Sequence, residues 1–392
     1  MSRGRRAVAA VLRHRMRVLI CAGGTGGGIY PALAAASALR RLGTGTEQLL
    51  WIGTRGEMEE ELVARAGIRL ETIAGGAMVG VPPHVVIRNG TRLGWSVFKA
   101  MRLLRQFRPD VMFMTGGYVA VPVVLACRLQ RVPITIFLPD VEPGSTIRFA
   151  MRFARRVACT TEGSRLFVPA DKMVVTGYPV RPELRAAAQL SLAEALDQFH
   201  LKPDRPTLFV FGGSRGARAI NRALIAILPE LLAQFQVIHL SGNLTWPEVA
   251  ANAETLPANL RVFYRPFPYL HDEMGAAFRA ADLVVARAGG SMLGECPAFG
   301  LPAILVPLTF AWRYQKVNAD FLTARGAAVQ LTDEELAEKL LPTTQALLAD
   351  KTRLAQMGAA ARALDNPDAA ANLARLVMAV GRGTGREQEV GA

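Results

Sequence analysis

The sequence predicts an α/β protein made of two Rossmann-like, doubly wound halves that face each other across a cleft. Three observations predict this fold class. An apolar segment followed by a glycine-rich turn and a helix occurs twice, starting at Arg17 and at Thr207. Short apolar strands alternate with helical segments after each copy, which is typical of a largely parallel sheet. The length of 392 residues exceeds one typical hydrophobic core and favours two domains.

The first copy begins with a buried strand over Val18 to Ala22, turns through Gly23 to Gly28, and continues into a helix with Pro31 in its first turn. Glycines permit positive φ, and a helix N-terminus offers unpaired N–H groups, so this turn suits phosphate or another anion. A tight turn without a ligand is the alternative. The second copy repeats the design with a strand, a turn and a helix that begins near Ala217, and its turn contains Gly212, Gly213, Ser214 and Gly216. Neither copy matches the complete dinucleotide or P-loop fingerprint.

The remaining elements follow from short apolar runs between turn residues. Strands are expected at 49–53, 111–115, 134–138, 156–160 and 173–177, then at 235–240, 260–264, 282–286, 303–307 and 327–331. Helices are expected at 57–66, 192–199, 332–341, 343–348 and 367–380. The predicted division is a basic tail over 1–16, a first domain over 17–185, a second domain over 186–380 whose last helix can pack back on the first, and a tail over 381–392.

The formal net charge of +14 favours an anionic partner, which is a nucleic acid, a lipid surface or a phosphorylated substrate. Residues 79–108 concentrate this charge, because Trp95, Phe98 and several aliphatic residues alternate with arginines and one lysine, with no acid among them. An amphipathic helix lying on an anionic membrane has this composition. A core-packing helix with a solvated basic face is the alternative. Nucleic-acid binding is not expected, since the apolar residues are mostly aliphatic and do not stack on bases.

No apolar run reaches the length that spans a bilayer, and the N-terminal apolar stretch is too short for a signal peptide. The four scattered cysteines lack a Cys-x-x-Cys pair, which predicts buried, reduced thiols in a cytoplasmic protein. The five histidines show no metal-ligand spacing. We therefore expect no metal site and no cofactor.

Several motifs, in their order along the chain, resemble those of the MurG family of glycosyltransferases over about 17–380. They are Thr25-Gly-Gly, Thr115-Gly-Gly-Tyr-Val, Gly177-Tyr-Pro-Val-Arg, Gly212-Gly-Ser-Arg-Gly-Ala-Arg, Arg287-Ala-Gly-Gly-Ser-Met-Leu-Gly-Glu, Gly300-Leu-Pro-Ala-Ile-Leu-Val-Pro and Gln315-Lys-Val-Asn-Ala. The resemblance implies a GT-B architecture and an inverting hexosyltransferase of peptidoglycan synthesis. Such an enzyme moves N-acetylglucosamine from UDP-N-acetylglucosamine to undecaprenyl-pyrophosphoryl-N-acetylmuramoyl-pentapeptide, as a peripheral protein on the cytoplasmic face of the cell membrane.

The resemblance also implies roles for residues. Glu295 would accept hydrogen bonds from the ribose hydroxyls, Arg181 and Ser214 would face the diphosphate, and Gln315 would read the sugar hydroxyls. The backbone around Leu270 would hold the uracil. The further substrate-binding residues that the motifs imply are Thr25, Gly26, Gly27, Gly117, Tyr118, Gly290, Ser291, Met292, Leu293 and Asn318. No Asp-x-Asp motif stands in a suitable place, so arginine and helix N-termini would stabilise the leaving UDP without a metal ion.

Two departures from the family pattern concern the base and the acceptor. The histidine that usually ends the first loop, a candidate base, is Gly28 here, and the usual His-Glu-Gln-Asn segment is replaced by Phe137-Leu-Pro-Asp-Val-Glu-Pro-Gly. This replacement brings Asp140 and Glu142 to a strand end, and we hypothesise that one of them is the base or an acceptor ligand. Capping of the following helix is the alternative for both. A transferase with a different lipid or small-molecule acceptor, or a non-catalytic protein that binds nucleotide sugars, also stays open.

Overall fold

The protein is described here by a computed structural model of residues 16–24, 26–73, 83–213, 216–308 and 313–383. It forms two compact units. The first contains Met1–Pro139, Pro143–Pro179 and Asp368–Ala392, and the second contains Asp140–Glu142 and Val180–Pro367. The predicted N-terminal tail lies outside the described residues except for residue 16. The unit boundary at Pro179 precedes the predicted boundary at 185, and the last helix is part of the first unit.

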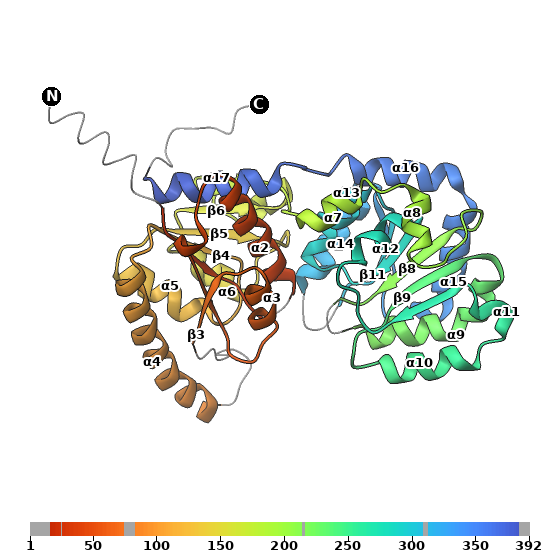
Figure 1. The fold of residues 1–392 in the computed structure, drawn as a ribbon, viewed down its shortest axis with the longest axis horizontal. Coiled ribbons are helices and arrows are strands. Elements are labelled where there is room, and N and C mark those ends of the chain that lie inside the picture. Colours follow the sequence, from red (N-terminus) through yellow and green to blue (C-terminus); the bar gives the residue numbers. More distant parts are fainter. Residues whose placement is uncertain (1–15, 25, 74–82, 214–215, 309–312, 384–392) are drawn as a thin grey trace. The chain divides into compact units, whose positions relative to one another are not determined.

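The first unit is a sheet of seven parallel strands in the order β3-β2-β1-β4-β5-β6-β7, with helices on its faces (Figure 1). Its strands are β1 (Val18–Cys21), β2 (Leu49–Gly53), β3 (Arg69–Thr72), β4 (Val111–Met114), β5 (Ile134–Leu138), β6 (Arg156–Cys159) and β7 (Met173–Val175). Its helices are α2 (Gly26–Arg41), α3 (Glu59–Arg65), α4 (Pro83–Phe107), α5 (Ala120–Leu129), α6 (Ser145–Met151) and α17 (Ala369–Gly381), with short 3₁₀ helices η1 (Thr46–Gln48) and η2 (Glu162–Leu166). Helix α17 packs on α2, and α4 packs on α5.

The second unit is a sheet of six parallel strands in the order β10-β9-β8-β11-β12-β13. Its strands are β8 (Thr207–Phe211), β9 (Gln236–Leu240), β10 (Tyr264–Phe267), β11 (Leu283–Ala286), β12 (Ala303–Leu305) and β13 (Ala328–Gln330). Its helices are α7 (Pro182–Ala187), α8 (Leu192–Asp197), α9 (Arg218–Gln234), α10 (Trp246–Thr255), α11 (Ala258–Arg261), α12 (Met274–Ala280), η3 (Gly290–Leu293), α13 (Glu295–Phe299), α14 (Arg313–Ala324), α15 (Leu336–Ala349) and α16 (Lys351–Arg362). The prediction of two doubly wound units with parallel sheets is therefore confirmed.

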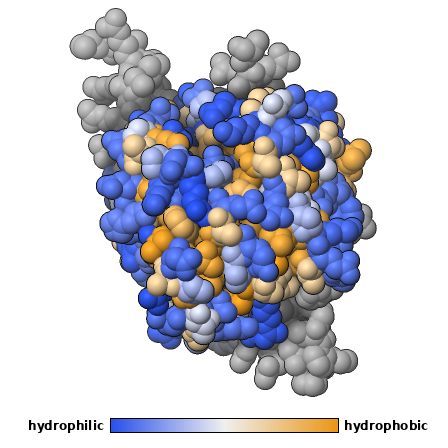
Figure 2. Space-filling model, turned by 90° about the vertical axis from the view of Figure 1, so that its right-hand side faces the viewer, coloured by the Kyte–Doolittle hydropathy of each residue, from blue (hydrophilic) through white to orange (hydrophobic). Residues whose placement is uncertain are grey.

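Each unit has its own hydrophobic core, because the central strands are buried on both faces. Trp51 on β2 is completely buried, and its indole nitrogen donates to the carbonyl oxygen of Ala22 at 2.9 Å. In the second unit, Phe278 on α12 packs edge to face against Phe209 on β8. Burial of one such side chain stabilises the fold by roughly 1.5–3 kcal/mol. On the face in Figure 2, apolar residues lie among hydrophilic ones, as on most protein surfaces.

Three local predictions are wrong. The strand expected at 260–264 begins only at Tyr264, because Pro257 starts the short helix α11 before it. The strand then includes Pro266, which is compatible with the position of β10 at the sheet edge. Helix α2 begins at Gly26, so Pro31 lies inside it and the last glycines of the predicted turn form its first turn. The expected break at Pro342 does not occur, since α15 runs through it and packs on α9.

Candidate functional site

The two glycine loops of the first unit meet at the carboxyl ends of the neighbouring strands β1 and β4. Gly117 has φ of +89°, and a Cβ atom there would lie 2.9 Å from the carbonyl oxygen of Gly23. The Thr115 hydroxyl donates to the carbonyl oxygen of Gly28 at 2.8 Å. Thus the Thr115-Gly-Gly motif packs directly on the first loop, and only glycine fits at Gly117.

Gly28 lies in the first turn of α2, where a Cβ atom would approach the Thr115 hydroxyl oxygen to 3.3 Å and Gly23 to 3.8 Å. The backbone φ of Gly28 is not in the left-handed region that is reserved for glycine. Gly28 therefore has no side chain that could accept a proton. The surrounding atoms restrict a larger side chain at this position only modestly. Gly26 and Gly27 share the same helical turn, whereas Thr25 lies outside the described residues.

The third glycine loop follows β8 in the second unit. Gly216 has φ of +74°, and a Cβ atom there would lie 2.3 Å from the carbonyl oxygen of Ser241 at the end of β9. That carbonyl accepts hydrogen bonds from the Asn221 side chain at 2.8 Å and from the Thr245 hydroxyl at 2.7 Å. Asn221 on α9 therefore holds the surface against which the loop packs. Ser214 lies outside the described residues.

Asn221 belongs to a buried polar network. Its amide nitrogen donates to Ser241 and Thr245, so its oxygen accepts from Nε2 of His239 at 3.0 Å. Nδ1 of His239 then accepts from the Tyr264 hydroxyl at 2.7 Å. This neutral histidine is fully buried, and burial lowers its pKa to about 3. The network thus joins β9, the first residue of β10, helix α9 and the N-cap of α10 behind the third loop.

His239 gives the second unit an acid-dependent stability. The unfolded chain binds a proton on this histidine near pH 6.5, whereas the folded unit binds it only near pH 3, so stability falls as the pH decreases from 7. We expect a loss of about 2 kcal/mol between pH 7 and pH 5 from this residue alone. Denaturant unfolding at both pH values should show that His239→Gln removes this part of the slope. His200→Asn, at an exposed position, should retain it; equal slopes in all three proteins would contradict the prediction.

Glu295 and Arg181 face each other within the second unit. Glu295 is the first residue of α13 and only 6% exposed, and its Oε1 lies 4.0 Å from a guanidinium nitrogen of Arg181, at the N-cap of α7. Burial raises the pKa of Glu295, while Arg181 and a hydrogen bond from Ser291 lower it. Gly290, Ser291, Met292 and Leu293 form η3, which Gly294 alone separates from Glu295. Most of the predicted donor residues therefore lie in two places. Gly290 to Leu293 and Glu295 follow the carboxyl end of β11, and Arg181 directly precedes α7.

Asp140 and Asn318 form a second polar group in this unit. The fully buried Asn318 amide donates to Asp140 at 2.7 Å and to the Ala288 carbonyl oxygen at 3.0 Å, and it accepts from the Val141 amide at 2.9 Å. The polar atoms of the Asn318 side chain are thus hydrogen-bonded within the protein. This geometry supports a role in positioning Asp140, in place of the predicted direct contact with substrate. Asp140 itself is half-buried. Its surroundings raise its pKa to about 6 by desolvation, against the hydrogen bond from Asn318, which lowers it.

The capping alternative for Asp140 and Glu142 is wrong. Helix α6 begins at Ser145 with Gly144 as its N-cap and has no acid in its first turn. Glu142 is buried, with 7% of its surface exposed, and is therefore harder for a substrate to reach than Asp140.

The other predicted residues lie as follows. Gln315, in the first turn of α14, accepts from the Leu308 amide at 3.0 Å and keeps its own amide N–H groups for other partners. Leu270 follows β10 and is buried, beside Tyr269 and His271, whose rings are 4.8 Å apart. Tyr118 is 49% exposed.

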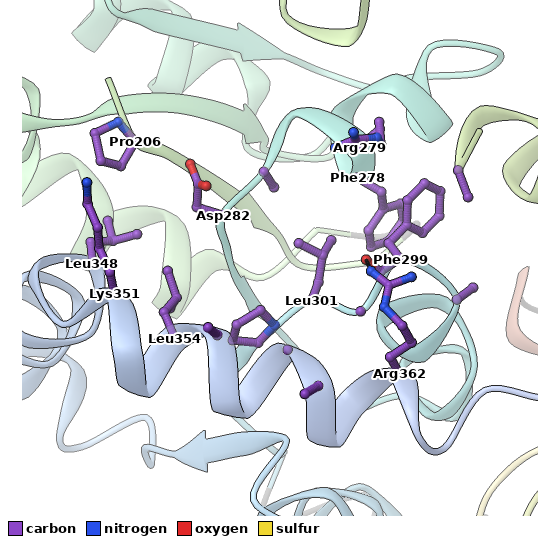
Figure 3. Close-up of a pocket in the computed structure, with 18 of the residues that line it drawn as sticks. Pro206, Phe278, Arg279, Asp282, Phe299, Leu301, Leu348, Lys351, Leu354 and Arg362 are labelled. Atoms are coloured by element: carbon purple, nitrogen blue, oxygen red, sulfur yellow. Dashed lines mark hydrogen bonds between the residues drawn. The ribbon is translucent and has the colours of Figure 1, made fainter. Parts of the chain in front are cut away.

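A cavity of about 1050 Å³ lies at the other end of the second sheet's strands, away from the residues described above (Figure 3). Pro206, Asp282 and Pro302 precede β8, β11 and β12, so the cavity opens at the amino ends of these strands, whereas ligands of open α/β sheets bind at the carboxyl ends. None of the predicted site residues lines it. Within the described ranges, no cluster of three His, Cys, Asp or Glu side chains is placed to hold a metal ion.

Sequence reasoning missed the buried polar residues behind the loops, namely Glu59, Asn221 and His239. Glu59 lies in an acid-rich helix that reads as a solvated surface. One sequence signal for its burial was available. Glu59 precedes the apolar Val63 by four residues, which places both on one face of the helix. In the structure both side chains are fully buried.

Comparison with known proteins covers both units. Residues 18–159 match the glycosyltransferase family 28 N-terminal domain, and residues 207–373 match the glycosyltransferase family 28 C-terminal domain. The UDP-N-acetylglucosamine–N-acetylmuramyl-(pentapeptide) pyrophosphoryl-undecaprenol N-acetylglucosamine transferase of Roseiflexus sp. (strain RS-1) is 38% identical, over 92% of this chain and 94% of its own. The transferase of the same name from Desulforudis audaxviator (strain MP104C) is 38% identical, over 94% of this chain and all of its own.

Solved structures agree with this similarity. The crystal structure of Acinetobacter baumannii MurG has a TM-score of 0.72 and 28% identity, and covers 93% of this chain and 99% of that one. The S. aureus MnaA–UDP structure has a TM-score of 0.68 at 12% identity, covers 95% of this chain and 99% of that one, and shares the fold.

Proposed function

Because this chain belongs to the MurG family of glycosyltransferases, we propose that it transfers N-acetylglucosamine from UDP-N-acetylglucosamine to undecaprenyl-pyrophosphoryl-N-acetylmuramoyl-pentapeptide in peptidoglycan synthesis. The observation that carries this function is the 38% identity to transferases of that name over nearly the whole of both chains. The grouping of Glu295, Arg181 and η3 in one unit supports it, since a nucleotide sugar needs a carboxylate for its ribose and donors for its diphosphate.

The donor would bind to the second unit. The amides of Met292 and Gly294 donate within the turn, whereas the amides of Gly290 and Ser291, at the start of η3, have no partner inside the helix and would bind the diphosphate. Arg181 would add a fixed cationic donor, and Glu295 would accept from the ribose hydroxyls. The backbone at Leu270 would hold the uracil, and Gln315 would bind the sugar hydroxyls. We also propose Met292, Leu293 and Ser214 as donor-site residues.

The acceptor would bind to the first unit. The loops that meet at Gly23 and Gly117 would surround its diphosphate, with amides at the start of α2 as donors, and Thr25, Gly26, Gly27 and Tyr118 would line this site.

The reaction would be a single displacement with inversion. The acceptor hydroxyl oxygen attacks the anomeric carbon of N-acetylglucosamine, the bond from that carbon to the diphosphate oxygen breaks, and UDP leaves with the bonding electrons. We propose that Asp140 takes the hydroxyl proton, in the role that Gly28 cannot fill. A pKa of about 6 leaves Asp140 ionised, yet sufficiently basic, at neutral pH. Arg181 and the η3 amides would stabilise the charge on UDP, and we expect no requirement for a metal ion.

The product and its donor preference test this function. We expect label from UDP-[¹⁴C]N-acetylglucosamine to appear in a short-chain lipid-linked muramyl-pentapeptide, with the mass increased by one N-acetylhexosamine. UDP-glucose should be a much poorer donor, and EDTA should not abolish transfer. Binding of the donor without transfer to this acceptor would point to a different acceptor.

We further propose that α4 attaches the protein to an anionic membrane surface, as a peripheral protein on the cytoplasmic face. The inner side of α4 is buried at Ala100, Leu103 and Leu104. Its outer side exposes Trp95 (75%) and Phe98 (57%), which contact each other, beside exposed basic residues such as Arg102. Aromatic and basic residues on one exposed face are suited to an anionic bilayer interface. No described helix is both long and apolar enough to cross a bilayer. Four buried, unpaired cysteines support a reducing compartment.

Vesicle flotation tests the membrane proposal. We expect the protein to float with vesicles that contain anionic lipid and to stay behind with neutral vesicles or at high salt. Replacing Trp95 and Phe98 together by serine should weaken this binding at least about tenfold, because both side chains would lose apolar burial. Leu244→Ser is the matched control, since Leu244 is equally exposed but lies in the second unit. Unchanged flotation of the double variant would contradict a role for α4.

A further inference from the structure

The first glycine loop rests on a buried carboxylate. Glu59, the first residue of α3, has no exposed surface. Its Oε1 accepts from the Thr54 amide at 2.9 Å, and its Oε2 accepts from the Gly24 amide at 3.3 Å. Thr54 follows β2 and Gly24 follows β1, so one side chain joins the ends of two neighbouring strands.

The packing around this carboxylate is close. A Cβ atom on Gly23 would lie 2.4 Å from Oε1 of Glu59, and a Cβ atom on Gly53 would lie 2.9 Å from its Cγ. Gly23 in the first loop and Gly53 at the end of β2 therefore both need to be glycine, because Glu59 occupies the space beside them. A buried carboxylate costs several kcal/mol unless hydrogen bonds compensate it, and here two backbone amides at loop ends do so. Such an arrangement is unfavourable for a side chain whose task is only to fill the core.

The position of Glu59 determines which amides stay available to an anion. The Gly24 amide is bound to the carboxylate, and negative charge directly behind it opposes a phosphate at that point. The amides of Gly26 and Gly27, in the first turn of α2, have no partner inside the helix. Through Gly23 the same carboxylate also supports the second loop, because a Cβ atom on Gly117 would lie 2.9 Å from the Gly23 carbonyl oxygen.

We propose that Glu59 is a positioning residue for the acceptor: it holds the first glycine loop so that the diphosphate of the acceptor is bound at Gly26–Gly27 and not at Gly24. This inference rests on the proposed function, because it assigns the first loop to a diphosphate-linked acceptor. It predicts a defect that is confined to the acceptor, since Glu59 is part of the first unit and the donor residues are part of the second.

Steady-state kinetics with Glu59→Gln, which keeps the volume but accepts well with only one atom, test the proposal. We expect the KM for the lipid-linked acceptor to rise roughly tenfold, with the KM for UDP-N-acetylglucosamine unchanged within about twofold. Glu59→Asp keeps the charge but shortens the reach and should give a smaller rise. The matched control is Glu61→Gln, which removes an exposed carboxylate of the same helix and its ion pair with Arg65, and should change neither KM.

Hydrogen–deuterium exchange separates the possible failures. In Glu59→Gln the peptide that spans Gly23 to Gly28 should exchange faster, while peptides of the second unit should not change. Equal loop exchange and an unchanged acceptor KM in a folded variant would overturn the proposal, as would equal losses for donor and acceptor. If the wild-type protein binds donor but transfers nothing to this acceptor, the proposed acceptor is wrong. In that case, faster exchange in the first glycine loop of Glu59→Gln would still show that Glu59 holds this loop in place.

Discussion

Asp140→Asn should lower kcat by about 10²- to 10⁴-fold, the usual contribution of a general base, with little change in the KM for UDP-N-acetylglucosamine. The amide has the same shape and keeps the contact with Asn318, but it cannot take a proton. Asp320→Asn is the matched control, because Asp320 is an exposed acid on the same helix as Asn318. A variant at 140 that retains more than about a tenth of the turnover would contradict the base assignment, and a loss found only in Glu142→Gln would transfer it to Glu142.

The pH dependence of kcat tests the role of Asp140 independently. A base must be deprotonated, so kcat should fall as the pH decreases through about 6, the pKa of Asp140. The hydrogen bond from Asn318 lowers this pKa. In Asn318→Ala the acid limb should therefore move to higher pH. A limb that stays in place would mean that another group controls it.

Glu295→Gln should lower kcat/KM for the donor by about 10- to 150-fold, which corresponds to the loss of one or two hydrogen bonds to a charged acceptor. The Glu295 carboxylate is 6% exposed and held between Arg181 and Ser291. Water therefore cannot easily take over the hydrogen bonds that the carboxylate would form with the ribose. Binding of UDP alone, measured by calorimetry, should weaken by a similar factor, because the ribose belongs to UDP.

The control for Glu295 is Glu248→Gln in the same unit. Glu248 is also an acid in the first turn of a helix, but it is exposed and paired with Arg222. We expect full activity and normal UDP affinity from this variant. Equal UDP affinity of the Glu295→Gln and wild-type proteins would remove Glu295 from the ribose site.

The fold was largely predictable because its strands are short, apolar and bounded by turns. Val18 to Cys21 and Leu283 to Ala286 are buried on both faces, and their sequences contain little else than apolar residues. Predictions were wrong where a local signal and tertiary packing disagree. Pro342 is a helix breaker in isolation, yet α15 continues through it because the helix is packed on α9. The edge strand β3, with Arg69 and Glu71, has no apolar run and was missed.

The candidate site was predictable where a motif stands in one stretch of sequence. Gly290 to Leu293 and Glu295 are of this kind, and the structure places them together. Contacts between distant residues were not predictable. Glu59 is 35 residues from Gly24, and Asn318 is 178 residues from Asp140. No local pattern states that these side chains meet, so their roles depend on the three-dimensional structure.

Release of UDP from UDP-N-acetylglucosamine by the purified protein, with and without a short-chain lipid-linked muramyl-pentapeptide, tests the central claim most directly. We predict release that requires the acceptor and is almost lost in Asp140→Asn. Such a result would identify donor, acceptor and base in one assay. Release at the same rate without the acceptor, or no release from a protein that binds both substrates, would contradict the assignment of this chain as an active transferase to the lipid-linked acceptor.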